Sequence, residues 1–364
     1  MMKSRRKKES IMTKRNLIIG SIILIIAVLV IGLLFLQGNG TEAALRRTII
    51  NNLEQDSETA SELQRTDRIT IVLVGTGSPL AQAGPQTSTA VFVNGQFLLF
   101  DAGNNTLDAM NSLNFPLYEL DAVFITHFHN DHYADLGDVM EWSWIWGRRH
   151  ILPVYGPIGI TQIVDGFQSA YELERSFRTA HHGEELMPPE WAPSEPIEFA
   201  ALTDDSAIVV YEKDGVTVKA FRVNHAPVEP SVGYRIEYAG KVVVLSGDTV
   251  RTTSLLEHSR NADLLVAEAM NKEVVGAIED INRELGYEGQ ANILFDIQDY
   301  HMDVSDVGAL ADEANVKRLA LNHLAPKPQS RRQANLFFRD PVAEQFSGEL
   351  FVGEDGMQIV IPVP

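Results

Sequence analysis

The stretch from residue 126 to residue 132 constrains this chain more than any other part of its sequence. It follows an apolar run, residues 120–125, that predicts a buried strand, and it precedes residues 134–146, which predict a helix. Within six positions it supplies four side chains of metal-binding type: His127, His129, Asp131 and His132. A lone histidine is usually structural. This spacing directly after a strand instead favours a metal site on the loop leaving a sheet.

The spacing also indicates how many metals the loop holds. In extended backbone the side chains of His127 and His129 point the same way, because side chains alternate along a strand. A turn at Asn130 then carries Asp131 and His132 round to a second position. Two imidazoles on one side, and a carboxylate with an imidazole on the other, predict two adjacent metal ions.

The start of the chain predicts a membrane anchor. Residues 1–16 hold seven basic residues and one acidic residue, and residues 17–36 hold no charge at all. At about 1.5 Å per residue, such a helix crosses a hydrocarbon core of about 30 Å. We therefore expect a basic cytoplasmic tail (1–16), one N-terminal transmembrane signal anchor (17–36) and a polar linker (37–68). The basic flank then stays inside, so that the domain at 69–364 faces outward from a single-pass cell-membrane protein. Cleavage near residues 43–44 is the alternative.

Charge and cysteine content narrow the classes of function. The chain has 30 basic and 49 acidic residues, a net charge of −19, and the tail carries seven of the basic ones. Proteins that bind nucleic acid normally show a basic footprint, so nucleic acid is an unexpected partner. Cysteine is absent, which excludes thiolate ligands, disulfides and a cysteine nucleophile.

Further metal ligands follow other predicted strands. His225 comes after the strand at 216–223, where a third imidazole completes a set with His127 and His129. Asp248 follows the strand at 241–245, where a carboxylate can bridge two cations. Glu268 and His323 come at the ends of two further apolar runs. Side chains that leave strand ends can be gathered at one sheet edge.

Together these pieces resemble the ribonuclease Z and bacterial arylsulfatase branch of the metallo-β-lactamase superfamily, over about residues 69–361. The matching segments are residues 75–79, 100–103, 126–132, His225 with 233–235, 246–249, Glu268, His301 and His323. The resemblance implies an α/β fold, a four-layer αβ/βα sandwich with a dinuclear site at one edge. Asp101, in the second segment, either hydrogen-bonds the metal loop or caps the next turn.

The resemblance also implies roles. One metal would be held by His127, His129, His225 and a bridging Asp248, the other by Asp131, His132, His323 and the same Asp248. Zinc suits nitrogen and oxygen ligands best, with iron or manganese as alternatives. The two metals would activate a shared water to hydroxide, to which Asp131 can hydrogen-bond. His301, oriented by Glu268, is nominated to protonate the leaving oxygen. A solvated histidine before the helix at 303–315 is the structural alternative for His301.

Several features favour a small substrate. Ala267 stands where ribonuclease Z usually has histidine, and residues 239–240 leave no room for a long tRNA-binding arm. Trp142 and Trp146 share a helix face, either as core or as an aromatic wall for an aryl group. Residues 271–300 form an acidic insertion that could act as a lid over the site, and residues 184–198 read as a surface loop.

The resulting prediction is a membrane-anchored dinuclear zinc hydrolase of small ester-like molecules, either aryl sulfates or phosphodiesters. The alternative is a tRNA 3′-processing endoribonuclease of the ribonuclease Z type. Lactonase activity and a non-catalytic metal-binding module are further alternatives, because a fold does not determine a function. The sequence leaves the oligomeric state open.

Overall fold

The computed structural model describes residues 41–51, 54–55, 57–80, 83–200, 202 and 206–364. The chain divides into two compact units, residues 1–58 and residues 59–364. In the first unit, residues 41–51 are helical and exposed. The predicted tail and membrane anchor, residues 1–36, lie outside the described residues. In the part of the chain that is described, no helix is both long and apolar enough to cross a membrane.

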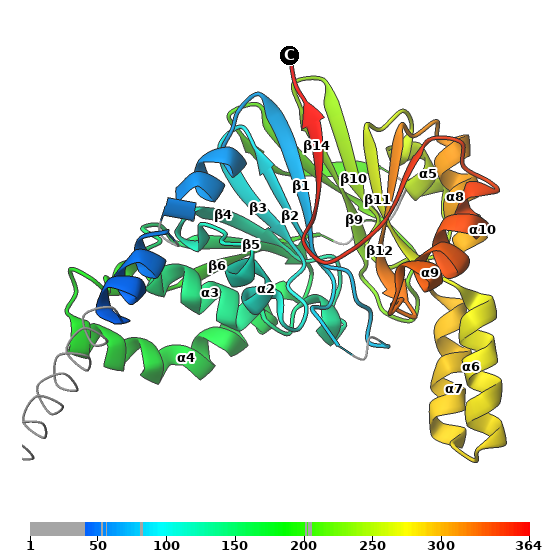
Figure 1. The fold of residues 1–364 in the computed structure, drawn as a ribbon, viewed down its shortest axis with the longest axis horizontal. Helices are drawn as coiled ribbons and strands as arrows, with labels where there is room; N and C mark the ends of the chain where they lie inside the picture. The colour runs from blue at the N-terminus through cyan, green and yellow to red at the C-terminus, as the bar shows by residue number, and fades with distance from the viewer. Residues whose placement is uncertain (1–40, 52–53, 56, 81–82, 201, 203–205) are drawn as a thin grey trace, which may run out of the picture. The chain divides into compact units, whose positions relative to one another are not determined.

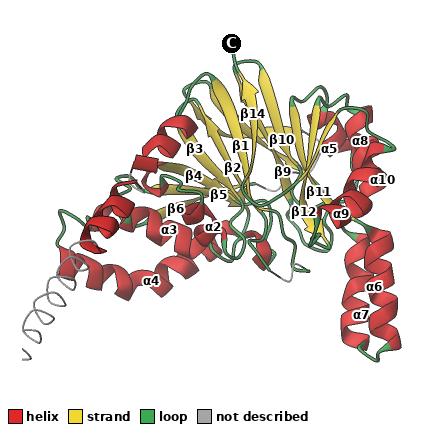
Figure 2. Ribbon diagram, viewed as in Figure 1, coloured by secondary structure: helices red, strands yellow, loops and turns green. Residues whose placement is uncertain are grey.

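The second unit is built on two mixed sheets (Figures 1 and 2), each with seven strands. The first sheet has the order β14-β1-β2-β3-β4-β5-β6. Its strands are β1 (Arg68–Gly75), β2 (Ser88–Val93), β3 (Gln96–Phe100), β4 (Leu120–Phe124), β5 (Leu152–Pro157), β6 (Ser194–Phe199) and β14 (Met357–Pro362). Neighbours from β14 to β3 pair antiparallel, and neighbours from β3 to β6 pair parallel.

The second sheet repeats this plan, with the order β13-β12-β11-β10-β9-β8-β7. Its strands are β7 (Ala207–Lys213), β8 (Val216–Arg222), β9 (Val232–Tyr238), β10 (Lys241–Leu245), β11 (Leu264–Met270), β12 (Arg318–Ala325) and β13 (Glu349–Val352). Neighbours from β7 to β10 are antiparallel, and neighbours from β10 to β13 are parallel.

Three apolar cores hold the layers together. The central core joins residues of both sheets, such as Ile71 and Leu98 from the first and Tyr234 and Val243 from the second. A second core lies between the other face of the first sheet and helices, and a third covers the second sheet in the same way. The longer helices are α2 (Thr106–Ser112), α3 (Leu136–Ile145), α4 (Ile160–His182), α5 (Thr253–Ser259), α6 (Lys272–Glu284), α7 (Glu288–Asp296) and α8 (Val304–Glu313); α9 (Arg331–Ala334) and α10 (Asp340–Ala343) are single turns. The predicted α/β architecture is therefore confirmed as two mixed sheets packed face to face, with helices on their outer faces.

Two local predictions turned out differently. Part of the predicted surface loop at 184–198 is strand β6, which pairs with β5. The prolines of this segment favour a loop, but β6 is an edge strand, where a proline such as Pro196 is tolerated. The core was one of two roles considered for Trp142 and Trp146, and only Trp142 takes it. Trp142 packs at the border of the second core, and Trp146 is 60% exposed.

Candidate metal centre

The metal loop leaves the end of β4 and is held in place by the end of β3. Asp101 has φ of 57°, in the left-handed region that aspartate tolerates better than most residues. Its carboxylate accepts hydrogen bonds from the backbone N–H of Thr126 at 2.8 Å and from the Thr126 hydroxyl at 2.9 Å. It also accepts one from His132 Nδ1 at 2.9 Å. Of the two roles considered for Asp101, the structure shows the one that fixes the metal loop.

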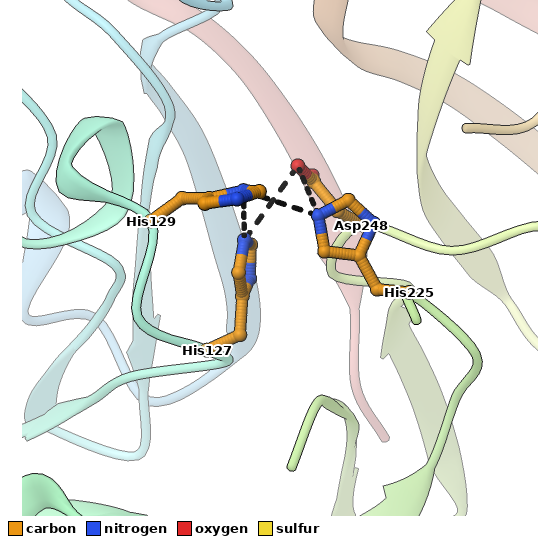
Figure 3. A group of neighbouring side chains, drawn as sticks. All are labelled: His127, His129, His225 and Asp248. Carbon is orange, nitrogen blue, oxygen red and sulfur yellow. Dashed lines mark hydrogen bonds and ion pairs between the residues drawn. The ribbon is translucent and has the colours of Figure 1, made fainter. Parts of the chain in front are cut away.

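Four side chains converge on one point in Figure 3: His127, His129, His225 and Asp248. His129 Nδ1 lies 3.2 Å from His127 Nε2 and 3.1 Å from His225 Nε2. Asp248 Oδ2 lies 3.8 Å from His127 Nε2 and 3.9 Å from His225 Nε2. Three imidazole nitrogens that face each other this closely fit a shared cation better than they fit hydrogen bonds with one another.

A second group adjoins the first through the same carboxylate. Asp248 Oδ2 lies 3.2 Å from His132 Nε2 and 3.3 Å from His323 Nε2. His323 Nε2 also lies 3.1 Å from Asp131 Oδ2. The donor atoms of Asp131, His132 and His323 lie within 4.8 Å of one another. Asp248 therefore stands between the two groups, as a bridging carboxylate would.

Backbone irregularities aim two of these side chains. Asn322 pairs with Glu268 and Leu324 pairs with Ala269, so His323 is the extra residue of a β-bulge, and its φ is 44°. A bulge turns a side chain out of the alternation of its strand, and such bulges often occur beside active sites. Asp248 follows Gly247, whose φ is 62° and where a Cβ atom would lie 2.7 Å from the carbonyl oxygen of Val232. Only glycine fits both the backbone conformation and the space there.

The outward nitrogens of His127, His132 and His225 are hydrogen-bonded, which leaves their inward nitrogens free to bind metal. His127 Nδ1 lies 3.1 Å from the Thr126 hydroxyl, and His225 Nδ1 donates to the backbone carbonyl of Tyr300 at 2.9 Å. Such contacts fix the tautomer of a metal-binding histidine. Asp248 Oδ1 and His323 Nδ1 are buried and have no hydrogen-bond partner among the described residues.

Electrostatics divide the histidines into two classes. Burial holds the pKa of His127 well below its ordinary value, and burial lowers that of His225 to about 4. Burial also opposes protonation of His323, but the carboxylates of Asp248 and Asp131 outweigh it and raise its pKa to about 9. The pKa of His132 is raised in the same way, by Asp248 and Asp101 against burial. Burial therefore favours the neutral form of His127 and His225, whereas the neighbouring carboxylates favour the protonated form of His132 and His323, and a metal bound there would have to displace a proton.

His301 and Glu268 lie beside this centre. His301 Nδ1 donates to Glu268 Oε2 at 2.8 Å, and the other carboxylate oxygen accepts from the backbone N–H groups of Thr249 and Met302. His301 is 6% exposed, and its ring stacks on that of His323 with centroids 5.3 Å apart. This burial and this carboxylate partner replace the solvated histidine considered from the sequence. All nine residues singled out for the site thus lie together, and their chemical roles stay predictions.

Comparison with known proteins identifies the family. Residues 97–324 match the family described as the β-lactamase superfamily domain. The ribonuclease Z of Mycobacterium bovis (strain BCG Pasteur) is 35% identical over 293 residues, which cover 78% of this chain and 95% of that protein. The chain belongs to the metallo-β-lactamase superfamily. Within it the curated relatives mark the ribonuclease Z branch.

Solved structures agree on the fold of this metallo-β-lactamase domain. A metallo-β-lactamase-fold protein of Bacillus subtilis covers 81% of this chain and all of its own, with a TM-score of 0.57 and 22% identity. The short form of human tRNase Z gives a TM-score of 0.57 and 21% identity, with 81% of this chain and all of its own covered. The family, the fold and the His/Asp clusters together indicate a hydrolase that acts on ester bonds and depends on divalent metal.

The comparisons correct three predictions. The main prediction, a membrane-anchored hydrolase of small aryl sulfates or phosphodiesters, is wrong, because the curated relatives of this superfamily member are named ribonuclease Z. The prediction that nucleic acid is an unlikely partner is also wrong, because the name of these relatives describes enzymes that act on RNA. The predicted cell-membrane location with an outward-facing domain is wrong on the same comparison. That prediction depended on residues 17–36, which lie outside the described residues.

Proposed function

We propose that this chain is an endoribonuclease of the ribonuclease Z type, which hydrolyses a phosphodiester bond at the 3′ end of tRNA precursors. The observation that carries the proposal is the identity with ribonuclease Z, 35% over 95% of the relative's length. The match to the β-lactamase superfamily domain, residues 97–324, includes the metal loop and the strands that carry the other donors. The short form of human tRNase Z shares the fold.

We assign two divalent metals to the centre, with zinc as the expected ion. His127, His129 and His225 would hold one ion, and Asp131, His132 and His323 would hold the other, with Asp248 shared between them. The donor set of imidazole and carboxylate without thiolate suits zinc, with manganese or iron as alternatives. Asp248 Oδ1, buried without a partner among the described residues, supports this assignment because a cation would satisfy it.

Metals in such a centre supply a nucleophile near neutral pH and neutralise charge on phosphate oxygens. The protein side chains do the remaining work. Asp131, which is 1% exposed, would accept a hydrogen bond from the attacking water and so orient it. His301 would donate a proton to the leaving ribose oxygen, because its Nδ1 is already bonded to Glu268 and its Nε2 is left for the substrate.

Local charge supports an RNA substrate where the net charge does not. Residues 327–339, which follow His323 and β12 on the chain, contain four basic residues and no acidic one. Lys327 is paired with Asp355 at 2.7 Å. Arg331, Arg332 and Arg339 are exposed and have no ion pair among the described residues. Exposed arginine side chains without an acidic partner, on the segment that follows β12, suit the phosphates of RNA.

The test compares initial rates of the zinc-loaded chain on three substrates: a 3′-extended tRNA, an aryl phosphodiester and an aryl sulfate. We expect cleavage of the tRNA at one position, slower turnover of the phosphodiester and none of the sulfate. Turnover of the aryl sulfate with the tRNA left intact would reject the proposal. A His129→Ala variant serves as the control for contaminating nucleases, because it lacks one inward-facing nitrogen.

A further inference from the structure

A cavity of about 210 Å³ opens beside the metal centre, and its walls are of two kinds. One wall is formed by metal-centre residues, among them His129, Asp131 and His301. The other wall is apolar, and three of its residues come from the second half of the insertion at 271–300: Ile293 of α7, Ile297 and Tyr300. No lysine or arginine lines the cavity. The apolar wall therefore has no group that would hold a phosphate.

The apolar wall is partly open to solvent. Ile293 is 60% exposed although it lies at the cavity, and helices α6 and α7 form a hairpin that extends beyond the sheets in Figure 1. Apolar side chains that group into an exposed patch can mark a place where a ligand covers them. Leu80 and Met270 continue the same wall from other parts of the chain.

The ring of Tyr300 is held at the junction of the two walls. Its centroid lies 4.8 Å from that of His225 with the planes at 90°, and 5.0 Å from that of His301. Its backbone carbonyl accepts the hydrogen bond from His225 Nδ1. The residue is thus fixed next to the metals, while its ring lines the cavity. Nothing in the sequence singled it out, because the contact with His225 uses the backbone.

We propose that this apolar wall, with Tyr300 at its centre, is a subsite for one unpaired nucleobase next to the scissile phosphate. The inference rests on the proposed ribonuclease function and deepens it. With the phosphate at the metals, the neighbouring base reaches the adjoining wall. Proteins recognise unpaired RNA bases by stacking them on aromatic rings and packing them on apolar side chains. Pockets for drug-sized ligands hold about 300–1,000 Å³, so this smaller cavity suits a single flat ring system.

The subsite gives the insertion at 271–300 a defined task. From its sequence this insertion could act as a lid. In the structure it consists of two helices, α6 and α7, and a 3₁₀ turn. In this proposal α7 positions the nucleotide beside the cleaved bond and selects for an unpaired base there. A base within a duplex is stacked on both faces and paired along one edge, so its faces are not available to Tyr300 and Ile293.

The test uses zinc-loaded full-length protein and 3′-extended tRNAs. One tRNA carries both bases that flank the cleaved bond, and each of two others is abasic at one of these two positions. For the wild type, we expect kcat/KM to fall about tenfold or more when the base at one of these positions is removed, as a stacking contact of this kind predicts. Tyr300→Ala should lower kcat/KM on the base-bearing substrate by a similar factor. It should leave kcat/KM on the abasic substrate nearly unchanged. The ratio of kcat/KM on the base-bearing substrate to kcat/KM on the abasic substrate should therefore approach one.

Two control variants separate base recognition from structural damage. Tyr300→Phe keeps the ring and should keep the ratio. Tyr287→Ala makes the same change at a tyrosine that precedes α7, is 55% exposed and does not line the cavity, so its ratio should equal that of the wild type.

Three results would overturn the subsite. The first is a wild-type ratio near one at both positions, and the second is an unchanged ratio in Tyr300→Ala. The third is loss of zinc from Tyr300→Ala, because the ring would then support His225 instead of a base. Cleavage of no RNA substrate at all, by any variant, would reject the proposed function together with the subsite.

Discussion

Replacement of Asp101 by asparagine isolates the hydrogen bond that orients His132. Asparagine has the same shape and tolerates the left-handed backbone at this position at least as well as aspartate. Its Oδ1 can still accept from the Thr126 N–H, but its NH₂ group then faces His132 Nδ1, which is now 2.9 Å from a carboxylate oxygen. To avoid two donors in contact, the imidazole would carry its proton on Nε2, the nitrogen that faces Asp248 at 3.2 Å.

The expected loss is about 10- to 100-fold in affinity for the metal held by His132, the range typical for partners of metal-binding histidines. It corresponds to about 1.4–2.8 kcal/mol, at about 1.4 kcal/mol per tenfold change. A hydrogen bond to a charged group contributes about 1.5–3 kcal/mol, so two independent estimates agree.

Isothermal titration of the metal-depleted protein with zinc measures this loss directly. The Asp101→Asn variant should bind one zinc as tightly as the wild type and the second more weakly. Asp121→Asn is the matched control, since this carboxylate accepts from the backbone N–H of Phe97 at 2.9 Å and pairs with Lys213, at the other end of β4. Two zinc affinities in Asp101→Asn equal to those of the wild type would refute the role given to Asp101.

Three further predictions concern the same centre. His129→Ala should abolish metal-dependent turnover but keep the far-ultraviolet circular dichroism of the wild type, because this half-exposed loop side chain contributes little to the apolar cores; retained turnover would contradict the site assignment. Zinc binding at His132 and His323 should strengthen by about tenfold per pH unit for each proton displaced, as the pH rises from 7 towards 9. The sign follows because Asp248 and Asp131, against burial, raise the pKa of His323 to about 9, so the metal must displace a proton below that pH; a pH-independent affinity, measured by titration at several pH values, would refute it. His301→Ala should lower kcat on tRNA by about 100-fold or more, in line with loss of a general acid, with two zinc ions still bound by elemental analysis; zinc loss would instead make His301 a ligand.

The sequence was sufficient to predict where the donors lie along the fold. Each of His225, Asp248 and Glu268 follows or ends an apolar β-run, and side chains at strand ends meet at a sheet edge. The metal loop was predicted for the same reason, and the turn after His129 is a 3₁₀ turn over Asn130–His132. The structure brings these side chains together because their positions depend on local patterns, namely apolar periodicity and the turn that follows it, while their roles as ligands stay predictions.

The features that were missed depend on distant contacts. β14 lies at the edge of the first sheet, where residues 357–362 pair with β1, although the two strands are almost 300 residues apart along the chain. His323 reaches the metal centre through a bulge against β11, which no pattern in its own strand announces. The substrate class was predicted wrongly for a similar reason. Net charge averages over the whole chain, whereas RNA would meet the local charge of residues 327–339, which is basic.

The proposed activity is metal-dependent cleavage of tRNA precursors at one place. The most direct measurement is single-turnover cleavage of a 3′-extended tRNA, with the new 3′ end mapped to the nucleotide. The protein is measured as prepared, after chelation of its metal, and after zinc is restored. We predict one cut at the 3′ boundary of the mature tRNA, lost on chelation and restored by zinc. Cleavage that survives chelation, or cuts scattered along the RNA, would contradict the proposed ribonuclease Z activity.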